Sequence, residues 1–166
     1  MEMREGICRF GLWRVQVVWS GNTVHRVRFT KTGTQSPVPA PFLQYVSGRE
    51  PDFSELISIA EQDNGPHQAI YLEVKGIPYG ETRTYKDIAE ATGTHPRFVG
   101  SAMRQNPTPI IIPCHRVVAQ NGPGGFTPEL SIKLDMLAME QKTLAREQRF
   151  QENQTGPKHT NGSTEE

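Results

Sequence analysis

The sequence predicts an α+β fold, with a small N-terminal β-rich lobe (residues 1–62) packed on a mainly helical C-terminal domain (residues 63–145). Residues 13–17 and 23–29 alternate apolar with polar side chains, as half-buried strands do. After Gly65 the apolar residues recur instead at helical spacing. The chain therefore has two differently built parts.

The N-terminal lobe begins with these two strands, which are joined at residues 20–22 by Ser, Gly and Asn, residues that favour a turn. Residues 31–41 are rich in Thr, Pro and Gly and predict a loop. Residues 41–46 predict a short helix that ends at Gly48. Residues 52–60 fit either a further strand or an irregular connection.

The C-terminal domain begins with a predicted helix over residues 66–76. Thr84 can cap a second helix over residues 85–91, and a third helix at residues 95–103 follows a tight turn at Gly93. Two short helices joined in this way form a helix-turn-helix pattern, although many αα-corners look alike.

A last helix is predicted over residues 130–145, where apolar side chains again recur at helical spacing. Beyond it, residues 146–166 contain a single large apolar side chain, Phe150. We expect this tail to be disordered, because it cannot bury enough apolar surface.

Length and composition limit the possible classes of protein. The 166 residues contain no apolar run near the ~20 residues that a transmembrane helix needs, and no signal-like apolar core at the start. Two cysteines, Cys8 and Cys114, do not make a disulfide framework, and five scattered histidines show no zinc-type spacing. We therefore expect no metal and no membrane contact, and a monomer in the reducing environment of the cytoplasm.

The net charge of the chain is zero, so overall charge does not favour a nucleic-acid partner. Locally, however, residues 91–122 contain no Asp or Glu, whereas Arg97, Arg104 and Arg116 are present. Such a segment can form a positive face for a polyanion, although chance also explains three arginines at this density.

One hexapeptide, residues 112–117, has the sequence Ile-Pro-Cys-His-Arg-Val and places the thiol of Cys114 directly before an imidazole and a guanidinium. Such neighbours lower a thiol pKa from about 8.5 toward neutrality and so favour the nucleophilic thiolate. The apolar run at residues 109–112 should be buried and deliver Cys114 to a pocket wall. The alternative is a small buried cysteine of the core.

These segments resemble the O6-alkylguanine-DNA alkyltransferases, DNA-repair proteins that accept one alkyl group irreversibly. The resemblance lies in Ile-Pro-Tyr-Gly-Glu-Thr at residues 77–82, Arg-Gln-Asn-Pro at 104–107, Pro-Cys-His-Arg-Val at 113–117 and the glycine-rich loop at 121–125. It implies a helix-turn-helix that binds the minor groove of double-stranded DNA and a nucleotide turned out of the stack. It implies O6-alkylguanine, with alkylated thymine as a further possibility, as the substrate, and no cofactor.

The resemblance also implies the catalytic residues. Cys114 would be the attacking thiolate, with His115 as its base through a bridging water, because neighbours in extended backbone point to opposite sides. Glu140 would orient the imidazole, as a carboxylate does in a triad. Tyr85 would crowd the phosphate of the target nucleotide and donate to the departing purine. Asn106 would tie the helix-turn-helix to the active-site backbone.

Further residues are implied to contact DNA or to line the substrate pocket. Arg97 would be the intercalating finger, Ser101 and Ala102 would allow close approach to the groove, and Arg104 is a secondary phosphate contact. The full set expected at the DNA is Thr84, Tyr85, Arg97, Ser101, Ala102 and Arg104. The set expected around the alkylated base is Val117, Gly124, Phe126 and Thr127.

One position departs from the family pattern, because Pro128-Glu129 replaces the usual glycine pair. A proline stiffens this loop, and a carboxylate near the entrance adds bulk and negative charge. The alkyl size that the pocket accepts therefore stays open, and we predict slow reaction with free benzylated guanine. Two other functions stay open. One is a non-catalytic helix-turn-helix binder of damaged DNA, and the other is a cysteine-histidine hydrolase, which would turn over repeatedly.

Overall fold

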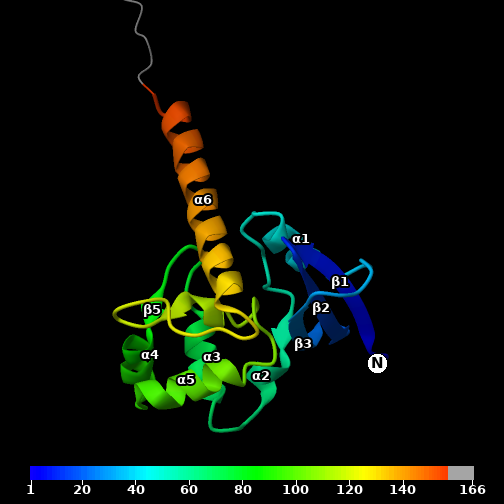
Figure 1. The fold of residues 1–166 in the computed structure, drawn as a ribbon, viewed down its shortest axis with the longest axis vertical. Coiled ribbons are helices and arrows are strands. Elements are labelled where there is room, and N and C mark those ends of the chain that lie inside the picture. The colour runs from blue at the N-terminus through cyan, green and yellow to red at the C-terminus, as the bar shows by residue number, and fades with distance from the viewer. Residues whose placement is uncertain (157–166) are drawn as a thin grey trace, which may run out of the picture.

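The first part of the chain forms a four-stranded sheet in the order β1-β2-β3-β4 (Figure 1). The computed structural model describes residues 1–156. Strands β1 (Arg4–Phe10), β2 (Trp13–Ser20) and β3 (Thr23–Thr30) form an antiparallel meander, and the short β4 (Ile57–Ser58) pairs with β3 in parallel. The predicted N-terminal strands are confirmed, with β1 added at one edge.

The sheet buries one face because its apolar residues alternate. In β2, Val15 and Val17 are fully buried, and the register places them opposite Phe29 and Val27 of β3. The turn between β2 and β3 contains Gly21 at a φ of +56°, a left-handed conformation that glycine adopts without strain.

Three short helices follow the meander. Helix α1 (Ala40–Val46) confirms the short helix predicted at residues 41–46, and α2 (Ile59–Gln62) and α3 (Gln68–Lys75) come next. The segment at residues 52–60, whose structure the sequence left open, contains β4 and the start of α2. Ser58 caps α2 with its side chain, which explains why the strand ends there.

The helix-turn-helix is confirmed. Helix α4 (Tyr85–Thr92) begins with a reciprocal capping box between Thr84 and Asp87. It ends at Gly93, which has a φ of +66°, and α5 (Pro96–Arg104) begins directly afterwards. A two-stranded parallel pair anchors the start of α4, formed by β5 (Arg83–Thr84) and β6 (Val117–Val118).

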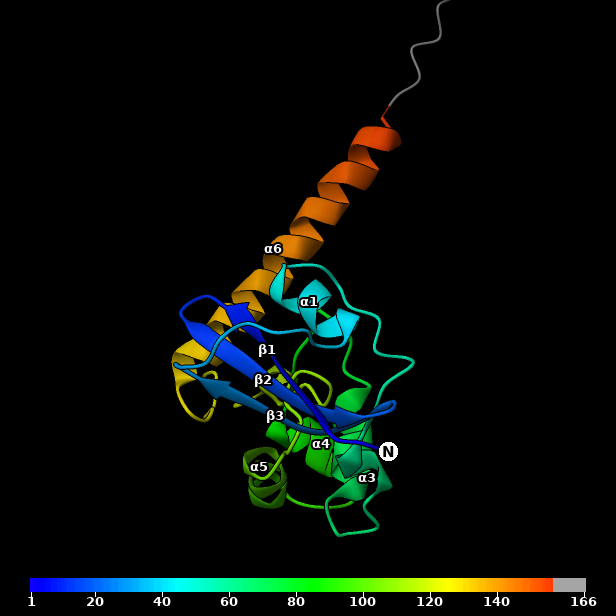
Figure 2. The same ribbon diagram turned by 90° about the vertical axis from the view of Figure 1, so that its right-hand side faces the viewer.

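The last helix, α6 (Leu130–Gln154), is longer than predicted. Its C-terminal half projects from the body of the molecule, as Figures 1 and 2 show. The expected disorder is therefore wrong for residues 146–154, because Glu, Gln and Arg are good helix formers even where nothing apolar is buried. Residues 157–166 of the predicted tail lie outside the described residues.

The two halves of the chain share one hydrophobic cluster. Val15 and Phe42 pack in it together with Ile110 and Met136, although these residues come from opposite ends of the sequence. Helices α3, α4 and α5 enclose a second cluster. A backbone hydrogen bond of 2.9 Å from the Val27 N–H to the Pro107 carbonyl also joins the halves. The boundary between residues 62 and 63 stays a prediction.

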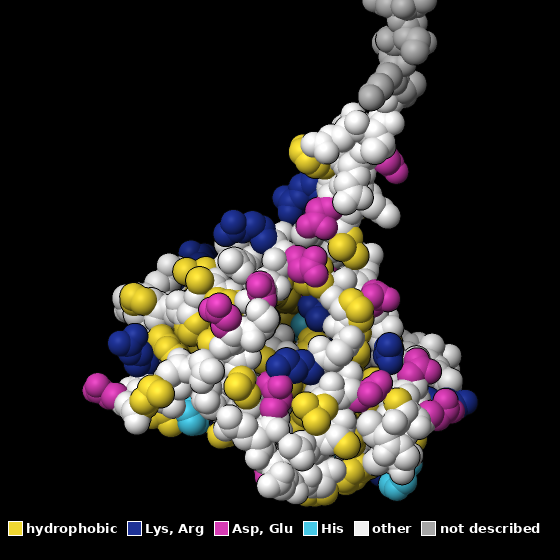
Figure 3. All heavy atoms as spheres, turned by 180° about the vertical axis from the view of Figure 1, so that it is seen from behind, with side chains coloured by type: hydrophobic (Ala, Val, Ile, Leu, Met, Phe, Trp, Pro, Cys, Tyr) yellow, Lys and Arg dark blue, Asp and Glu magenta, His cyan; other side chains and the backbone are white. Residues whose placement is uncertain are grey.

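Charges on the face in Figure 3 are mixed, with Lys and Arg interspersed among Asp and Glu. This agrees with the zero net charge of the sequence. Among residues 1–156, no helix is both long and apolar enough to cross a membrane.

Candidate active site

Cys114 begins a 3₁₀ turn, Cys114–Arg116, rather than an extended segment. The backbone N–H of Cys114 donates to the Ile112 carbonyl at 2.7 Å, and the preceding residues 110–112 are buried. Ile110 has a φ of +79°, a strained conformation for a β-branched side chain that the surrounding core maintains. The predicted extended backbone is therefore wrong, but the prediction of a buried apolar run before the cysteine is confirmed.

A cavity of about 550 Å³ lies over Cys114, between α4, α5 and the loop before α6. Cys114 is 8% exposed and forms part of its wall. A cavity of this size suits a small organic ligand such as a nucleobase. The lining residues that the sequence predicts for the site are Tyr85, Arg97, Arg104, Asn106, Cys114, Phe126 and Thr127.

The pKa of Cys114 does not follow the sequence-based expectation. Burial raises the pKa of its thiol above the usual value, against the opposing effects of a hydrogen bond from Asn106 and the charge of Lys133. The neighbouring His115 and Arg116 side chains bind Glu140 instead of the sulfur. The resting protein therefore holds a protonated thiol, which needs a base before it can attack.

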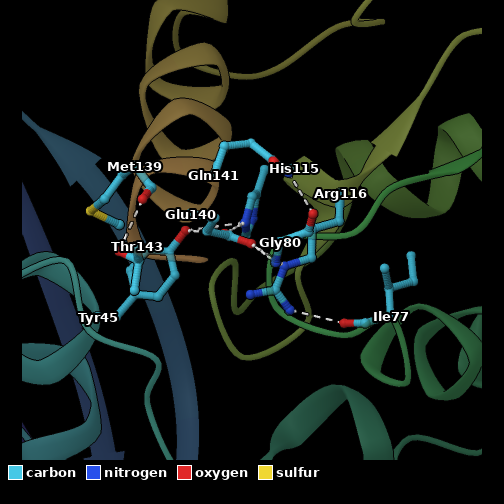
Figure 4. A network of polar contacts seen from close by, with 9 residues as sticks. All are labelled: Tyr45, Ile77, Gly80, His115, Arg116, Met139, Glu140, Gln141 and Thr143. Carbon is cyan, nitrogen blue, oxygen red and sulfur yellow. Dashed lines mark hydrogen bonds and ion pairs between the residues drawn. The ribbon is translucent and has the colours of Figure 1, made fainter. Parts of the chain in front are cut away.

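Glu140, on α6, is fully buried at the centre of a polar network (Figure 4). Its Oε1 accepts hydrogen bonds from Arg116 Nε at 2.8 Å and from the backbone N–H of Gly80 at 2.9 Å. Its Oε2 accepts one from the Tyr45 hydroxyl at 2.6 Å and lies 2.5 Å from His115 Nε2. Both carboxylate oxygens are thus fully used.

This environment keeps Glu140 ionised and His115 neutral. Burial alone would raise the pKa of Glu140, but hydrogen bonding to His115 and the nearby positive charge lower it to about 2. Burial lowers the pKa of His115 despite the Glu140 carboxylate. With Nε2 facing Glu140, the remaining nitrogen, Nδ1, is buried and has no hydrogen-bond partner within residues 1–156. A neutral imidazole in this tautomer can accept a proton at Nδ1.

Asn106 connects the helix-turn-helix with the segment that carries the cysteine. Its Nδ2 donates to the Ile112 carbonyl at 2.8 Å, and its Oδ1 accepts from the Thr108 N–H at 3.0 Å. This is the connection that the resemblance implies, and it fixes the start of the active-site segment relative to the end of α5.

Two predicted pocket residues, Val117 and Gly124, do not line the cavity, and one predicted DNA contact, Ala102, is buried. Ala102 is 0% exposed and faces the core, so the prediction that its side chain lies at the DNA is wrong. Thr84 caps α4 with its hydroxyl, and its contact with DNA stays a prediction. Val117 is also fully buried and does not line the cavity, and its carbonyl accepts a 2.6 Å hydrogen bond from Lys133. Ser101, in contrast, is partly exposed on α5.

The loop over the cavity is held by close contacts. Gly124 has a φ of +74°, and a Cβ there would lie 2.7 Å from the Tyr85 hydroxyl, so only glycine fits. Phe126 packs edge-on against Phe29 of β3, with ring centroids 5.8 Å apart. Because Phe126 also lines the cavity, the sheet helps to set the width of the site.

Sequence reasoning missed two residues of the site, Tyr45 and Lys133. Tyr45 lies on α1, and no local pattern joins it to Glu140, 95 residues away. Lys133 is fully buried, and its ammonium donates to the Val117 carbonyl and, at 3.2 Å, to that of Gly125. The seven-residue spacing of Lys133 and Glu140, two turns of one helix, was the available signal.

Burial lowers the pKa of Lys133 to about 8. Within residues 1–156, no group of three or more His, Cys, Asp or Glu side chains is placed to hold a metal ion.

Comparison with known proteins agrees with this geometry. Residues 66–142 match the family model described as the DNA-binding domain of 6-O-methylguanine DNA methyltransferase. A methylated-DNA–protein-cysteine methyltransferase of Metallosphaera sedula is 46% identical over 96 residues, which cover 58% of this chain and 61% of that protein. The chain thus spans about three fifths of the length of the first curated relatives that it matches.

Solved structures extend the likeness over most of the chain. The Mycobacterium tuberculosis OGT, solved in complex with DNA, is 26% identical to this chain with a TM-score of 0.69. The match covers 82% of this chain and 92% of that one. An O6-methylguanine DNA methyltransferase of Methanococcus jannaschii has 30% identity and a TM-score of 0.59, covering 81% of this chain and 92% of that one. With the cysteine, its histidine–glutamate pair and the helix-turn-helix in place, the chain belongs to the O6-methylguanine DNA methyltransferase family.

Proposed function

We propose that this protein repairs DNA by transferring the alkyl group of O6-alkylguanine irreversibly to its own Cys114. The observation that carries the proposal is the position of this thiol in the wall of a base-sized cavity, next in sequence to an imidazole that a buried carboxylate orients. Because the thiol is consumed in the proposed reaction, one nucleophile and one base suffice, and no further group is needed to regenerate the cysteine.

The reaction begins with the removal of the thiol proton. His115 Nδ1 takes it from Cys114, directly or through one water, and Glu140 stabilises the imidazolium that forms. The sulfur then forms a bond to the alkyl carbon while the bond from that carbon to guanine O6 breaks. The electron pair leaves on the purine, which gains the displaced proton at N1. The products are unmodified guanine and a thioether on Cys114.

Tyr85 is the proposed donor to the departing purine. It lines the cavity, and burial raises the pKa of its hydroxyl, so the group stays protonated at neutral pH and can donate a hydrogen bond. Charge that develops on the purine is thereby stabilised where it appears.

Access to the damaged base requires that it leave the DNA duplex. Turning a nucleotide out of the stack costs roughly a few kcal/mol of stacking and base-pairing free energy. Arg97 is exposed at the start of α5 and lines the mouth of the cavity, where its side chain can fill the vacated space. We propose that α5 lies in the minor groove, with Ser101 and Arg104 near the backbone.

The protein acts in this proposal as a single chain on double-stranded DNA. Its place is the reducing cytoplasm, because a free nucleophilic thiol survives there. The division into residues 1–62 and 63–145 is part of it, with the cavity in the second part. Binding of alkylated DNA without chemistry is the competing function.

Intact-mass spectrometry tests the proposal. The protein is mixed with a duplex that contains one O6-methylguanine, and a gain of one methylene unit is expected, limited to one per chain. Peptide mapping should place the methyl group on Cys114 and leave Cys8 unmodified. Binding of the duplex without any gain of mass would support the binding-only function, and repeated release of product would indicate a turnover enzyme.

The accepted alkyl size gives a second prediction. Thr127 lines the cavity, and the next residues are Pro128 and Glu129, of which Glu129 lies 3.8 Å from Lys31 of the N-terminal part. A stiff, tethered loop should admit a methyl group but slow the entry of free O6-benzylguanine. We expect Pro128→Gly with Glu129→Gly to speed benzyl labelling by about tenfold, because glycine restores the mobility of the loop. A fluorescent benzylguanine probe measures this rate.

The methyl-transfer rate from duplex DNA is the control for that pair of substitutions and should change by less than about twofold, because the loop does not carry the reacting groups. Rapid benzyl labelling of the unaltered protein would contradict the prediction.

A further inference from the structure

We propose that Tyr45 is a positioning residue for alkyl transfer and that the N-terminal part of the chain thereby completes the active site; this inference rests on the proposed function. The Tyr45 hydroxyl lies 2.6 Å from Glu140 Oε2 and 3.1 Å from His115 Nε2 (Figure 4). It therefore contacts both members of the pair that prepares the thiol, and it acts on the reaction through them.

Tyr45 comes from α1, outside the residues that match the family model. Its side chain is 1% exposed and packs edge-on against the rings of His115 and Tyr79, at 6.0 and 6.2 Å between centroids. A buried hydroxyl without partners is costly, so this one holds its two contacts firmly.

The end of α1 is also fixed to α6, the helix that carries Glu140. The carbonyl of Gly48 accepts hydrogen bonds from the Thr143 hydroxyl at 2.6 Å and from the Arg146 guanidinium at 3.1 Å. Gly48 itself has a φ of +77°, which reverses the chain directly after α1. The hydroxyl of Tyr45 and the carboxylate of Glu140 therefore keep one relative position.

The direction of each hydrogen bond follows from charge. Burial and the carboxylate of Glu140 raise the pKa of Tyr45, so the phenol keeps its proton and donates it to the ionised Glu140. The same carboxylate oxygen accepts the Nε2 proton of His115. With that proton held at Nε2, the lone pair of the imidazole stays on Nδ1, the nitrogen proposed to accept the thiol proton.

The hydroxyl also moderates the field of Glu140. A carboxylate that shares its charge with a second donor holds the proton of an imidazolium less strongly. The titratable and charged groups that face His115 are Tyr45, Arg116, Lys133 and Glu140. Loss of the Tyr45 hydroxyl leaves Oε2 to His115 alone. The imidazolium is then favoured, so at acid pH a larger fraction of His115 is already protonated and cannot accept the thiol proton.

The test compares Tyr45→Phe with a matched control, Tyr79→Phe, whose hydroxyl is buried next to the same network but has no partner within residues 1–156. Single-turnover methyl transfer from a duplex that contains O6-methylguanine is followed between pH 5 and 9. Tyr45→Phe is expected to shift the acid limb of the rate profile upward by about half to one pH unit, which slows transfer about three- to tenfold on that limb. Tyr79→Phe should follow the unaltered protein.

A role limited to packing would lower the rate or the melting temperature but leave the acid limb in place, and that outcome overturns the inference. A second readout needs no substrate. NMR titration of His115, identified by comparison with His115→Asn, should show its pKa raised in Tyr45→Phe and unchanged in Tyr79→Phe. If the unaltered protein accepts no methyl group, the proposed function fails, and this titration still decides the role of Tyr45.

Discussion

Cys114→Ser is expected to abolish alkyl transfer while leaving the affinity for duplex DNA unchanged within about twofold, because serine is nearly isosteric and the DNA-contacting side chains are untouched. A serine hydroxyl is a far weaker acid than a thiol, so the base that suffices for the sulfur cannot produce a useful alkoxide. We expect a loss of at least about 10⁴-fold in rate. Intact-mass spectrometry over several hours measures transfer, and fluorescence anisotropy measures binding.

The matched control is Cys8→Ala. Cys8 is 3% exposed within the sheet, and burial raises its pKa to about 11, so it has neither access nor thiolate character. Its replacement should leave transfer at one alkyl group per chain. A gain of mass in Cys114→Ser would assign the chemistry to another residue and refute the proposed mechanism.

Glu140→Ala is expected to show the largest effect on stability, because it leaves Arg116 as a buried charge without its partner. Removing one member of a buried ion pair typically costs about 3–5 kcal/mol of the free energy of unfolding. Transfer should slow by about 10²–10⁴-fold, because His115 loses the group that orients it and stabilises its charged form. Urea unfolding at pH 7 measures the first effect, and single-turnover kinetics measure the second.

Glu140→Gln keeps the shape of the side chain and serves where the alanine variant does not fold. Glu147, exposed on the same helix, is the control, and Glu147→Ala should change stability by less than about 0.5 kcal/mol. The folded pKa of Glu140 is lowered from 4.5 to about 2, so its stabilising effect is full above pH 4.5 and is lost as pH falls toward 2. The stability difference between wild type and Glu140→Gln should narrow accordingly. A difference that does not depend on pH would contradict an ionised Glu140.

Local patterns in the sequence were sufficient for the helix-turn-helix and for the position of the thiol. The capping residue Thr84, the turn at Gly93 and the apolar run before Cys114 all act over a few residues, and each is where its pattern predicts it. Ala102 could have been placed as well. It stands three residues after Val99 on α5, and both are fully buried.

The remaining features depend on contacts between distant segments. Tyr45 reaches Glu140 across 95 residues, and no spacing rule connects them. Burial raises the pKa of Cys114, and a turn sends the side chains of His115 and Arg116 toward Glu140 and away from the sulfur. Adjacency in sequence reveals neither effect. Helix α6 is longer than predicted because helix propensity, and not apolar burial, maintains residues 146–154.

The convergence at Glu140 has a consequence for how the molecule unfolds. The Glu140 side chain accepts hydrogen bonds from Tyr45 of α1, from the backbone at Gly80 and from both His115 and Arg116 of the active-site turn. No one of these segments can detach without stranding a buried charge, so opening any of them is coupled to opening the rest. The contacts that make unfolding cooperative are therefore the same contacts that orient His115. A chain that has opened locally at Glu140 is expected to have lost the proposed alkyl transfer as well.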